Sequence, residues 1–174
     1  MNSPSDPLNL PNGASFMIVE SSAASGGARI EFEVAMPPGA QGPPRHFHPH
    51  QHESWHVIDG ELTLEIEGRE HNLSSGEAKK IAPGTVHTFA NRGATLVRFR
   101  ELHSPALDFQ QYIETLARLG AEGRIGSRPT IRSLVYAAMV LERHRKTQLT
   151  ASRAQRAAES ILALAGRALG CRID

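Results

Sequence analysis

The sequence predicts a mainly β fold that is followed by an α-helical C-terminal extension. Runs of alternating polar and apolar residues, separated by Gly and Pro, are typical of short antiparallel strands. The three clearest runs are RIEFEV at 29–34, HVIDGELTLEIEG at 56–68 and TLVRFRE at 95–101. From residue 108 onward the apolar residues recur at helical spacing instead, which indicates helices.

The composition is that of an ordinary folded domain and excludes several protein classes. Of 174 residues, 40% are hydrophobic and 21% are charged, which argues against wholesale disorder. The net charge of +1 provides no excess of positive charge that would favour binding to nucleic acid or to an anionic membrane. Cys171 is the only cysteine, so an internal disulfide framework is excluded. Neither a long apolar run nor a basic-then-apolar start is visible, and we expect a cytoplasmic protein without a membrane span.

The charge is divided unevenly along the chain. Residues 1–107 hold 8 Lys and Arg against 12 Asp and Glu, whereas residues 108–174 hold 11 against 6. The texture changes at the same place, from short alternating runs to helical spacing. We therefore divide the chain into an N-terminal arm (1–28), a β part (29–107) and a helical extension (108–174).

Glycine and proline mark the turns of the β part. Asp59-Gly60 lies between two alternating runs and predicts a two-residue hairpin turn, because Gly tolerates positive φ. Gly68 marks the next turn, and Pro83-Gly84 precedes a further run at 85–91. Between the first two turns, a period of two places three apolar side chains on one face of a strand. They are Leu62, Leu64 and Ile66.

Three helices are expected in the extension. Their ranges are 109–119 with a stop at Gly120, 130–144, and 151–169 with a stop at Gly170. The link 121–129 is rich in Gly and Arg and predicts an exposed loop. Large apolar side chains of the last two helices are expected to be packing stripes. They are Leu134, Val135, Met139 and Leu141, and Ile161, Leu162, Leu164, Ala165 and Leu169.

Nine histidines are present, and five of them lie within HFHPHQHESWH at 46–56. One interpretation is a solvated tract that binds metal weakly. Against it, His46 and His48 are two residues apart, so on a strand both imidazoles point to one side. Glu53 has the opposite parity and joins them only if the chain breaks register, for which Pro49 supplies a reason. His87 follows the Pro83-Gly84 turn and offers a separate imidazole.

In these residues the chain resembles the cupins over roughly 29–105. The first cupin motif is similar to His46, His48, Glu53 and Gly60 here, and the second to Gly76, Pro83, Gly84, His87 and Asn91. The sequence departs from the cupin motifs at two positions. Both affect expected turns, and neither is an expected ligand. Ala40 stands where the first motif usually opens with glycine, and Pro83 lies one place late.

The resemblance implies a small jelly-roll β-barrel in which three histidines and one glutamate hold a divalent metal. The implied ligands are His46, His48, Glu53 and His87. Imidazole and carboxylate suit Fe, Mn, Ni, Zn or Cu and do not select among them. Open coordination positions would admit substrate or dioxygen. Resemblance to flavonol-dioxygenase-like cupins also implies that Glu53 can leave the metal and act as a base.

Strand parity suggests a substrate pocket around the metal. If Glu53 points inward, Trp55 does too, and His87 brings Phe89 inward with Asn91 near the strand end. Plain core packing is the alternative for these residues. Arg98 and Arg100 share one face of their strand: facing inward they would indicate an acidic substrate, and facing outward they are solvated charge, which we favour.

The remaining histidines have weaker claims. His50, His52 and His56 adjoin the expected ligands without an assigned role. His71, His103 and His144 are surface or core residues by default, although His103 has a slightly better case because it ends the last strand.

These features lead to three functional hypotheses. The first is a metal-dependent enzyme acting on a small organic molecule, with dioxygenase chemistry as the commonest implication of the resemblance. A non-redox isomerase, cyclase or lyase fits the same residues, and so does a non-catalytic small-molecule binder or sensor. The resemblance also implies a homodimer, in which the proline-rich arm is a candidate strand donor.

The basic extension raises a separate hypothesis about partners. Positive residues gather near the last helix connection, as in a nucleic-acid reader. They are Arg143, Arg145, Lys146, Arg153 and Arg156. A helical tail that covers the barrel or forms a subunit contact is favoured over nucleic-acid binding, because the excess is small and no clear turn glycine separates the last two helices.

Overall fold

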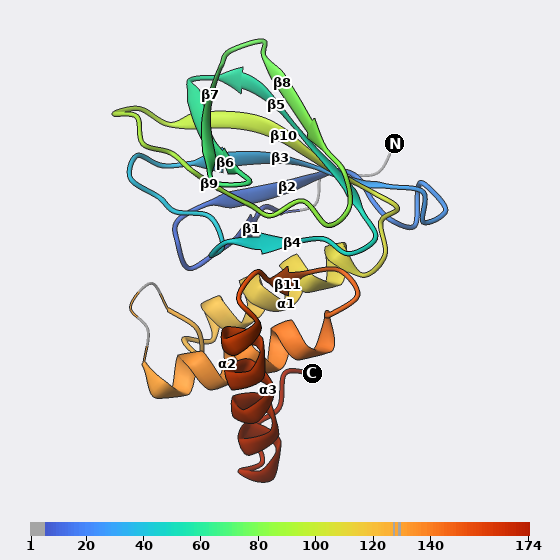
Figure 1. Ribbon diagram of the computed structural model, residues 1–174, viewed down its shortest axis with the longest axis vertical. Coiled ribbons are helices and arrows are strands. Elements are labelled where there is room, and N and C mark those ends of the chain that lie inside the picture. Colours follow the sequence, from blue (N-terminus) through green and yellow to red (C-terminus); the bar gives the residue numbers. More distant parts are fainter. Residues whose placement is uncertain (1–5, 127, 129) are drawn as a thin grey trace.

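The computed structural model describes residues 6–126, 128 and 130–174. Two antiparallel sheets face each other, and the helices lie together on one side of them (Figure 1). The six-stranded sheet has the order β1-β2-β3-β10-β5-β8. Its strands are β1 (Leu8–Asn9), β2 (Ser15–Glu20), β3 (Ile30–Met36), β5 (His52–Asp59), β8 (Ala78–Ile81) and β10 (Val97–Ser104).

The second sheet has five strands in the order β11-β4-β9-β6-β7. Its strands are β4 (His46–Phe47), β6 (Glu61–Ile66), β7 (Arg69–Ser74), β9 (His87–Ala90) and β11 (Leu149–Thr150). From β3 to β10 the chain passes from one sheet to the other at every step except that from β6 to β7, and the architecture is the expected jelly-roll barrel. The mainly β fold class with C-terminal helices is therefore confirmed.

The barrel core fills the space between the sheets. Phe32, Trp55 and Phe99 come from the six-stranded sheet, and Leu62 and Leu64 from the five-stranded sheet. All five are fully buried, and each such side chain contributes roughly 1.5–3 kcal/mol of transfer free energy. The expected inward face of β6 is thus confirmed for its two leucines.

Two glycines show why the backbone turns where it does. Gly60, between β5 and β6, has φ of +85°, and a Cβ there would lie 2.8 Å from the carbonyl oxygen of Leu96. Before β4, a Cβ on Gly42 would lie 2.8 Å from the carbonyl oxygen of Phe89. Gly42, two residues after Ala40, therefore permits the close approach to Phe89, and alanine at position 40 does not prevent it.

The helices of the extension are α1 (Phe109–Ala121), α2 (Ile131–Arg143) and α3 (Arg153–Ala168). Thr130 and Ser152 cap α2 and α3, since each side-chain oxygen accepts a backbone N–H of the first turn. Gly170 follows α3 with φ of +75° and ends it as expected. Gly120 does not end α1, which continues to Ala121. Positions 127 and 129 of the expected loop lie outside the described residues.

The extension is joined to the barrel at three places. β11 pairs with β4, which places two residues of the extension in the five-stranded sheet. Helix α1 contacts β1. Phe109, at the start of α1, stacks on His103 of β10 with 3.6 Å between the ring centroids. The segment assigned to the N-terminal arm supplies β1 and β2 to the same chain's sheet.

Helix α3 contradicts one packing expectation. Ile161, Leu164 and Leu169 are 68%, 64% and 80% exposed, rather than buried against α2. The helices instead meet at Gly166, where an added Cβ would lie 2.6 Å from Val135 and 2.7 Å from Met139. Glycine at position 166 lets α2 and α3 approach each other closely, and the large apolar residues of α3 lie outside this contact. No helix in the described ranges is both long and apolar enough to cross a bilayer.

Candidate metal centre

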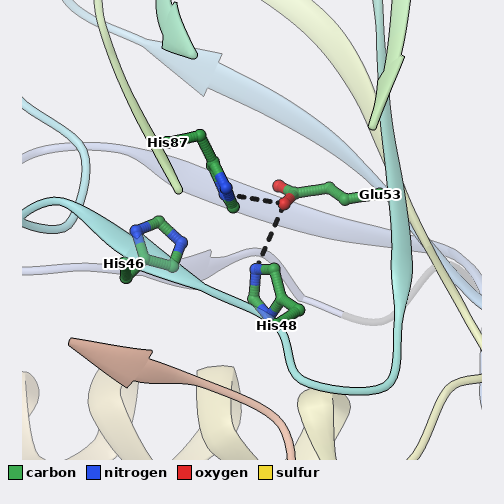
Figure 2. A group of neighbouring side chains, drawn as sticks. All are labelled: His46, His48, Glu53 and His87. Atoms are coloured by element: carbon green, nitrogen blue, oxygen red, sulfur yellow. Dashed lines mark ion pairs between the residues drawn. The ribbon is translucent and has the colours of Figure 1, made fainter. Parts of the chain in front are cut away.

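Four buried side chains converge between the two sheets (Figure 2). His46 lies on β4 and His87 on β9, and the two residues are register partners in the five-stranded sheet. Glu53 reaches in from β5 of the opposite sheet, and His48 follows β4 directly. One ligand atom from each of the four lies within 4.8 Å of the others. The break in register expected near Pro49 is present, since β4 ends at Phe47 and β5 begins at His52.

Backbone carbonyls fix the tautomer of all three histidines. The Nδ1 atoms of His46 and His87 lie 2.9 Å from the carbonyl oxygens of Pro44 and Thr85, and Nδ1 of His48 lies 2.6 Å from that of Thr147. A carbonyl oxygen only accepts, so each Nδ1 carries the proton and donates it. Each Nε2 is left with a free lone pair, which is the form that binds a metal ion.

The free atoms then face each other in an arrangement that calls for a cation. Glu53 Oε2 lies 2.8 Å from His87 Nε2 and 3.1 Å from His48 Nε2. These three atoms are buried and have no hydrogen-bond partner in the part of the chain that the structure describes. Lone pairs at such distances repel unless a proton or metal ion lies among them. The donor set therefore fits a divalent transition metal.

The charges of the cluster shift the pKa values of its members. Burial alone would raise the pKa of Glu53, but the charges of His87, His103 and His48 outweigh it and hold that pKa well below its ordinary value. Burial, assisted by His87 and His48, lowers the pKa of His46. For His87, burial lowers the pKa, but Glu53 outweighs it and the net shift is upward. Glu53 is consequently ionised at neutral pH, as a metal ligand must be.

A second group, which the sequence analysis did not assign to the site, adjoins Glu53 on the six-stranded sheet. Glu101 and His103 lie on β10, and His103 Nε2 lies 2.9 Å from Glu101 Oε1 and 3.7 Å from Glu53 Oε1. Burial, with the charge of Glu53, raises the pKa of Glu101 well above its ordinary value. Burial also lowers the pKa of His103 to about 3. Burial therefore disfavours the charged form of both groups in the metal-free protein.

The parity of β10 was the sequence signal for this group, and the same parity decides between the two orientations considered for Arg98 and Arg100. Phe99, Glu101 and His103 point into the barrel, so Arg98 and Arg100 point out. Arg98 pairs with Glu33, and Arg100 lies 3.2 Å from the same carboxylate. The outward orientation that we favoured for both arginines is confirmed, and neither belongs to the substrate pocket. The acidic substrate that an inward orientation would have indicated loses its support.

Of the other three residues expected in the substrate pocket, one lines the cavity and two do not. Phe89 lines the cavity beside the ligands. Trp55 does not: it is fully buried in the core, with its ring 5.4 Å from that of His87. The amide of Asn91 donates to the carbonyl oxygens of Met36 and Thr95, both at 2.8 Å, and holds the backbone rather than a ligand.

The five histidines of the tract separate into two buried residues and three exposed residues. His50, His52 and His56 are exposed, with the last two on the outer face of β5 opposite to Glu53. Only the first two histidines of the tract take part in the buried cluster. Of the histidines that we expected to be surface or core residues, His103 and His144 are buried.

A cavity of about 430 Å³ opens onto this cluster, within the usual size range of small-molecule sites. His46, His48, Glu53 and Glu101 line its inner end. Helix α1 supplies part of its wall through Phe109, Tyr112, Ile113 and Leu116. The extension thus forms part of the pocket and covers the barrel, which agrees with the favoured expectation for the tail.

The extension also supports a candidate ligand from behind. The carbonyl oxygen of Thr147 accepts from His48, while the Thr147 hydroxyl donates to Asp108. Asp108 also accepts from Nδ1 of the buried His144 at 2.7 Å. It stands at the N-cap position of α1, yet its carboxylate bonds to these two residues. A hydrogen-bonded series therefore leads from His48 to the start of α1.

Most of the basic residues considered for nucleic-acid binding already have partners within the chain. Arg143 pairs with Asp174 and Arg145 with Glu142. Arg156 donates to the carbonyl oxygens of Thr150 and Ala151. The connection between α2 and α3 contains β11, which pairs with the barrel. These contacts favour a structural role for the tail.

Asp108→Ala tests the support of His48. We expect it to weaken zinc binding by about tenfold, the lower end for loss of an outer-shell partner, because the Thr147 segment loses its anchor. Competition with a chromophoric chelator measures the affinity. Glu114→Ala is the matched control, since that carboxylate bonds to Gln110 on the same helix. Equal affinities for the two variants would contradict the proposed support.

Comparison with known proteins gives a family for the barrel. Residues 32–103 match the cupin domain. An oxidoreductase of Arthrobotrys oligospora is 41% identical over 54 residues, which are 30% of this chain and 21% of that protein. The HTH-type transcriptional regulator PuuR of Escherichia coli is 35% identical over 49 residues, 28% of this chain and 26% of the regulator. The chain thus spans less than a third of either relative.

Solved structures agree on the fold. KdgF from Halomonas sp. aligns with a TM-score of 0.53 at 23% identity, over 61% of this chain and 93% of that one. A predicted oxalate decarboxylase from Thermotoga maritima aligns with a TM-score of 0.53 at 20% identity, over 57% and 92%. At these identities the likeness concerns the fold. Residues 32–103 therefore match the cupin domain in sequence, and the barrel that contains them shares the fold of these solved structures.

Proposed function

We propose that this chain is a metal-dependent enzyme acting on a small organic molecule, with His46, His48, Glu53 and His87 as ligands of a divalent transition metal. The observation that carries the proposal is the set of facing lone pairs on Glu53 and two histidines, which are compatible with burial only when a proton or a metal ion lies among them. The adjoining cavity gives a substrate access to the same atoms.

The chain's own residues supply the groups for catalysis. When bound, the metal would provide Lewis-acid or redox chemistry at its open positions. Glu53 is ionised and is the residue we propose as a base when its carboxylate is free of the metal. Glu101 lines the same cavity, and its raised pKa favours the protonated carboxyl group, which can hold a proton there. The apolar wall excludes water, which strengthens the polar interactions inside.

Oxygen consumption distinguishes the proposed reaction classes. Iron- or manganese-loaded protein is supplied with phenolic, enolic and keto-acid compounds, and oxygen uptake is measured together with product formation by NMR. Uptake that depends on substrate supports dioxygenase-type chemistry, and conversion without uptake supports an isomerase, cyclase or lyase. Tight binding without conversion across the panel would contradict enzymatic function and favour a binder or sensor. Glu53→Gln controls for reactions of free metal.

Metal binding should depend on pH through His87. Its pKa is raised in the metal-free protein, so protons compete with the metal from above the ordinary titration range of histidine. Below that raised pKa, we expect the affinity for zinc to fall by roughly tenfold per pH unit, while Glu53 stays ionised. Chelator competition between pH 8 and pH 5.5 measures the slope, and an unchanged affinity over that interval would contradict the ligand assignment.

Homodimer formation and cytoplasmic localisation, which we expect from the resemblance and the sequence, remain predictions.

A further inference from the structure

The wall of the cavity is apolar over most of its extent. Barrel residues contribute Phe16 and Phe89, and the helical extension contributes Phe109, Ile113 and Leu116. A substrate that fills this space must offer apolar surface of its own, because burial of its polar groups against such a wall costs free energy. The part of the substrate distant from the metal centre is therefore constrained by these side chains.

The charged groups of the wall constrain the substrate further. Glu53 and Glu101 are its only acidic side chains, and no Lys or Arg lines it within the described residues. Arg98 and Arg100, which the sequence offered as anion partners, lie on the outer face of β10 beside Glu31 and Glu33. A phosphate or carboxylate in the cavity would have no cationic side chain to pair with.

The charge of the metal centre sets how much negative charge a substrate can bring. A divalent ion carries two positive charges, and ionised Glu53 balances one of them, since the three histidines bind in neutral form. One anionic oxygen of a substrate neutralises the remainder. A second negative charge would be buried near Glu101 without compensation.

We infer that the site takes a largely apolar small molecule that places a single anionic oxygen at the metal, and that it rejects compounds that carry a second negative charge, such as a phosphate or an additional carboxylate. This inference rests on the proposed function, because the metal centre binds the ionised oxygen. It adds to that function a substrate class, set by the apolar wall and by the outward placement of the basic residues.

Two hydroxypyranones that differ at one position test the inference by binding rather than by turnover. Allomaltol carries a methyl group where comenic acid carries a carboxylate, and both bind zinc through the same pair of oxygens. Zinc-loaded protein is titrated with each by isothermal calorimetry at pH 7.5. We expect allomaltol to bind at least about thirtyfold more tightly, because the carboxylate is buried without a partner. The affinity of each compound for free zinc is measured as the reference.

A charge introduced at the cavity wall should abolish this preference. Leu116 is partly buried on α1, so Leu116→Lys places an ammonium group at the wall with little loss of core packing. We expect the preference to fall to about threefold or less in this variant, and to persist in Leu116→Gln, which is the uncharged control. Circular dichroism checks that both variants are folded.

The outcomes separate the inference from the proposed function. Comenic acid or glucose 6-phosphate binding the wild-type protein as tightly as allomaltol would overturn the inference, and so would failure of allomaltol to bind zinc-loaded protein. In each case the zinc content and its loss in His48→Ala still report on the centre. A zinc content that His48→Ala leaves unchanged would overturn the proposed function instead.

Discussion

His87→Ala is expected to lower the affinity of the chain for zinc by at least about a hundredfold, more than the loss of any outer-shell partner. The substitution removes one of four donor atoms and leaves Glu53 Oε2 without its contact at 2.8 Å. His48→Ala should have a similar effect. Metal content after dialysis, and chelator competition for the affinity, measure the loss.

His56→Ala is the matched control for this experiment. It lies in the same histidine-rich tract, but its side chain is exposed on the outer face of β5. Its affinity for zinc should equal that of the wild-type protein. If His56→Ala and His87→Ala lost zinc to the same degree, a diffuse histidine tract would replace the buried centre as the explanation.

Phe109→Ala should produce the largest loss of stability among substitutions in the extension. The ring is 3% exposed, stacks on His103 at 3.6 Å between centroids and also lies 6.1 Å from Phe32. Removing a buried phenylalanine costs about 3–5 kcal/mol of unfolding free energy, a large part of the 5–15 kcal/mol typical of a domain. Urea denaturation of the metal-free protein measures the change.

Leu169→Ala controls for the loss of an apolar side chain from the same extension. Leu169 is 80% exposed, so its removal should change the unfolding free energy by less than about 0.5 kcal/mol. A comparable loss in the two variants would mean that Phe109 does not anchor the extension to the barrel.

The proposed ligand set was accessible to sequence reasoning because its signals are local. His46 and His48 are two residues apart. Pro49, which lies between His48 and Glu53, accounts for the break in register that brings Glu53 to the same site. His87 is identified by the turn before it. The barrel strands around these residues were likewise indicated by alternation and by turn residues within short windows.

The pocket was harder to predict because its parts are distant in sequence. The carbonyl oxygen that orients His48 belongs to Thr147, 99 residues further along the chain. A backbone atom leaves no residue-type signal, so no motif would have shown it. Glu101 and His103 did leave a signal, since their parity on β10 is opposite to that of Arg98, but it identifies a site only once the ligands across the barrel are known.

The amphipathic rule predicted the wrong buried face for α3, and the reason is again a contact with a distant part of the chain. The rule assigns large apolar residues to the buried face, but close helix contact here requires small ones. Gly166 and Ala163 form the buried side, and Ile161 remains exposed. The sequence contains both patterns on one helix, and only the position of α2 decides between them.

The hydrogen bond from His48 to Thr147 links two equilibria that are otherwise separate. The barrel holds every proposed metal ligand, whereas the acceptor of this bond belongs to the extension. If an extension in place makes metal binding more favourable by a certain free energy, bound metal favours the docked extension by the same amount, because thermodynamic coupling is reciprocal. On that condition, bound metal and the docked extension would stabilise each other.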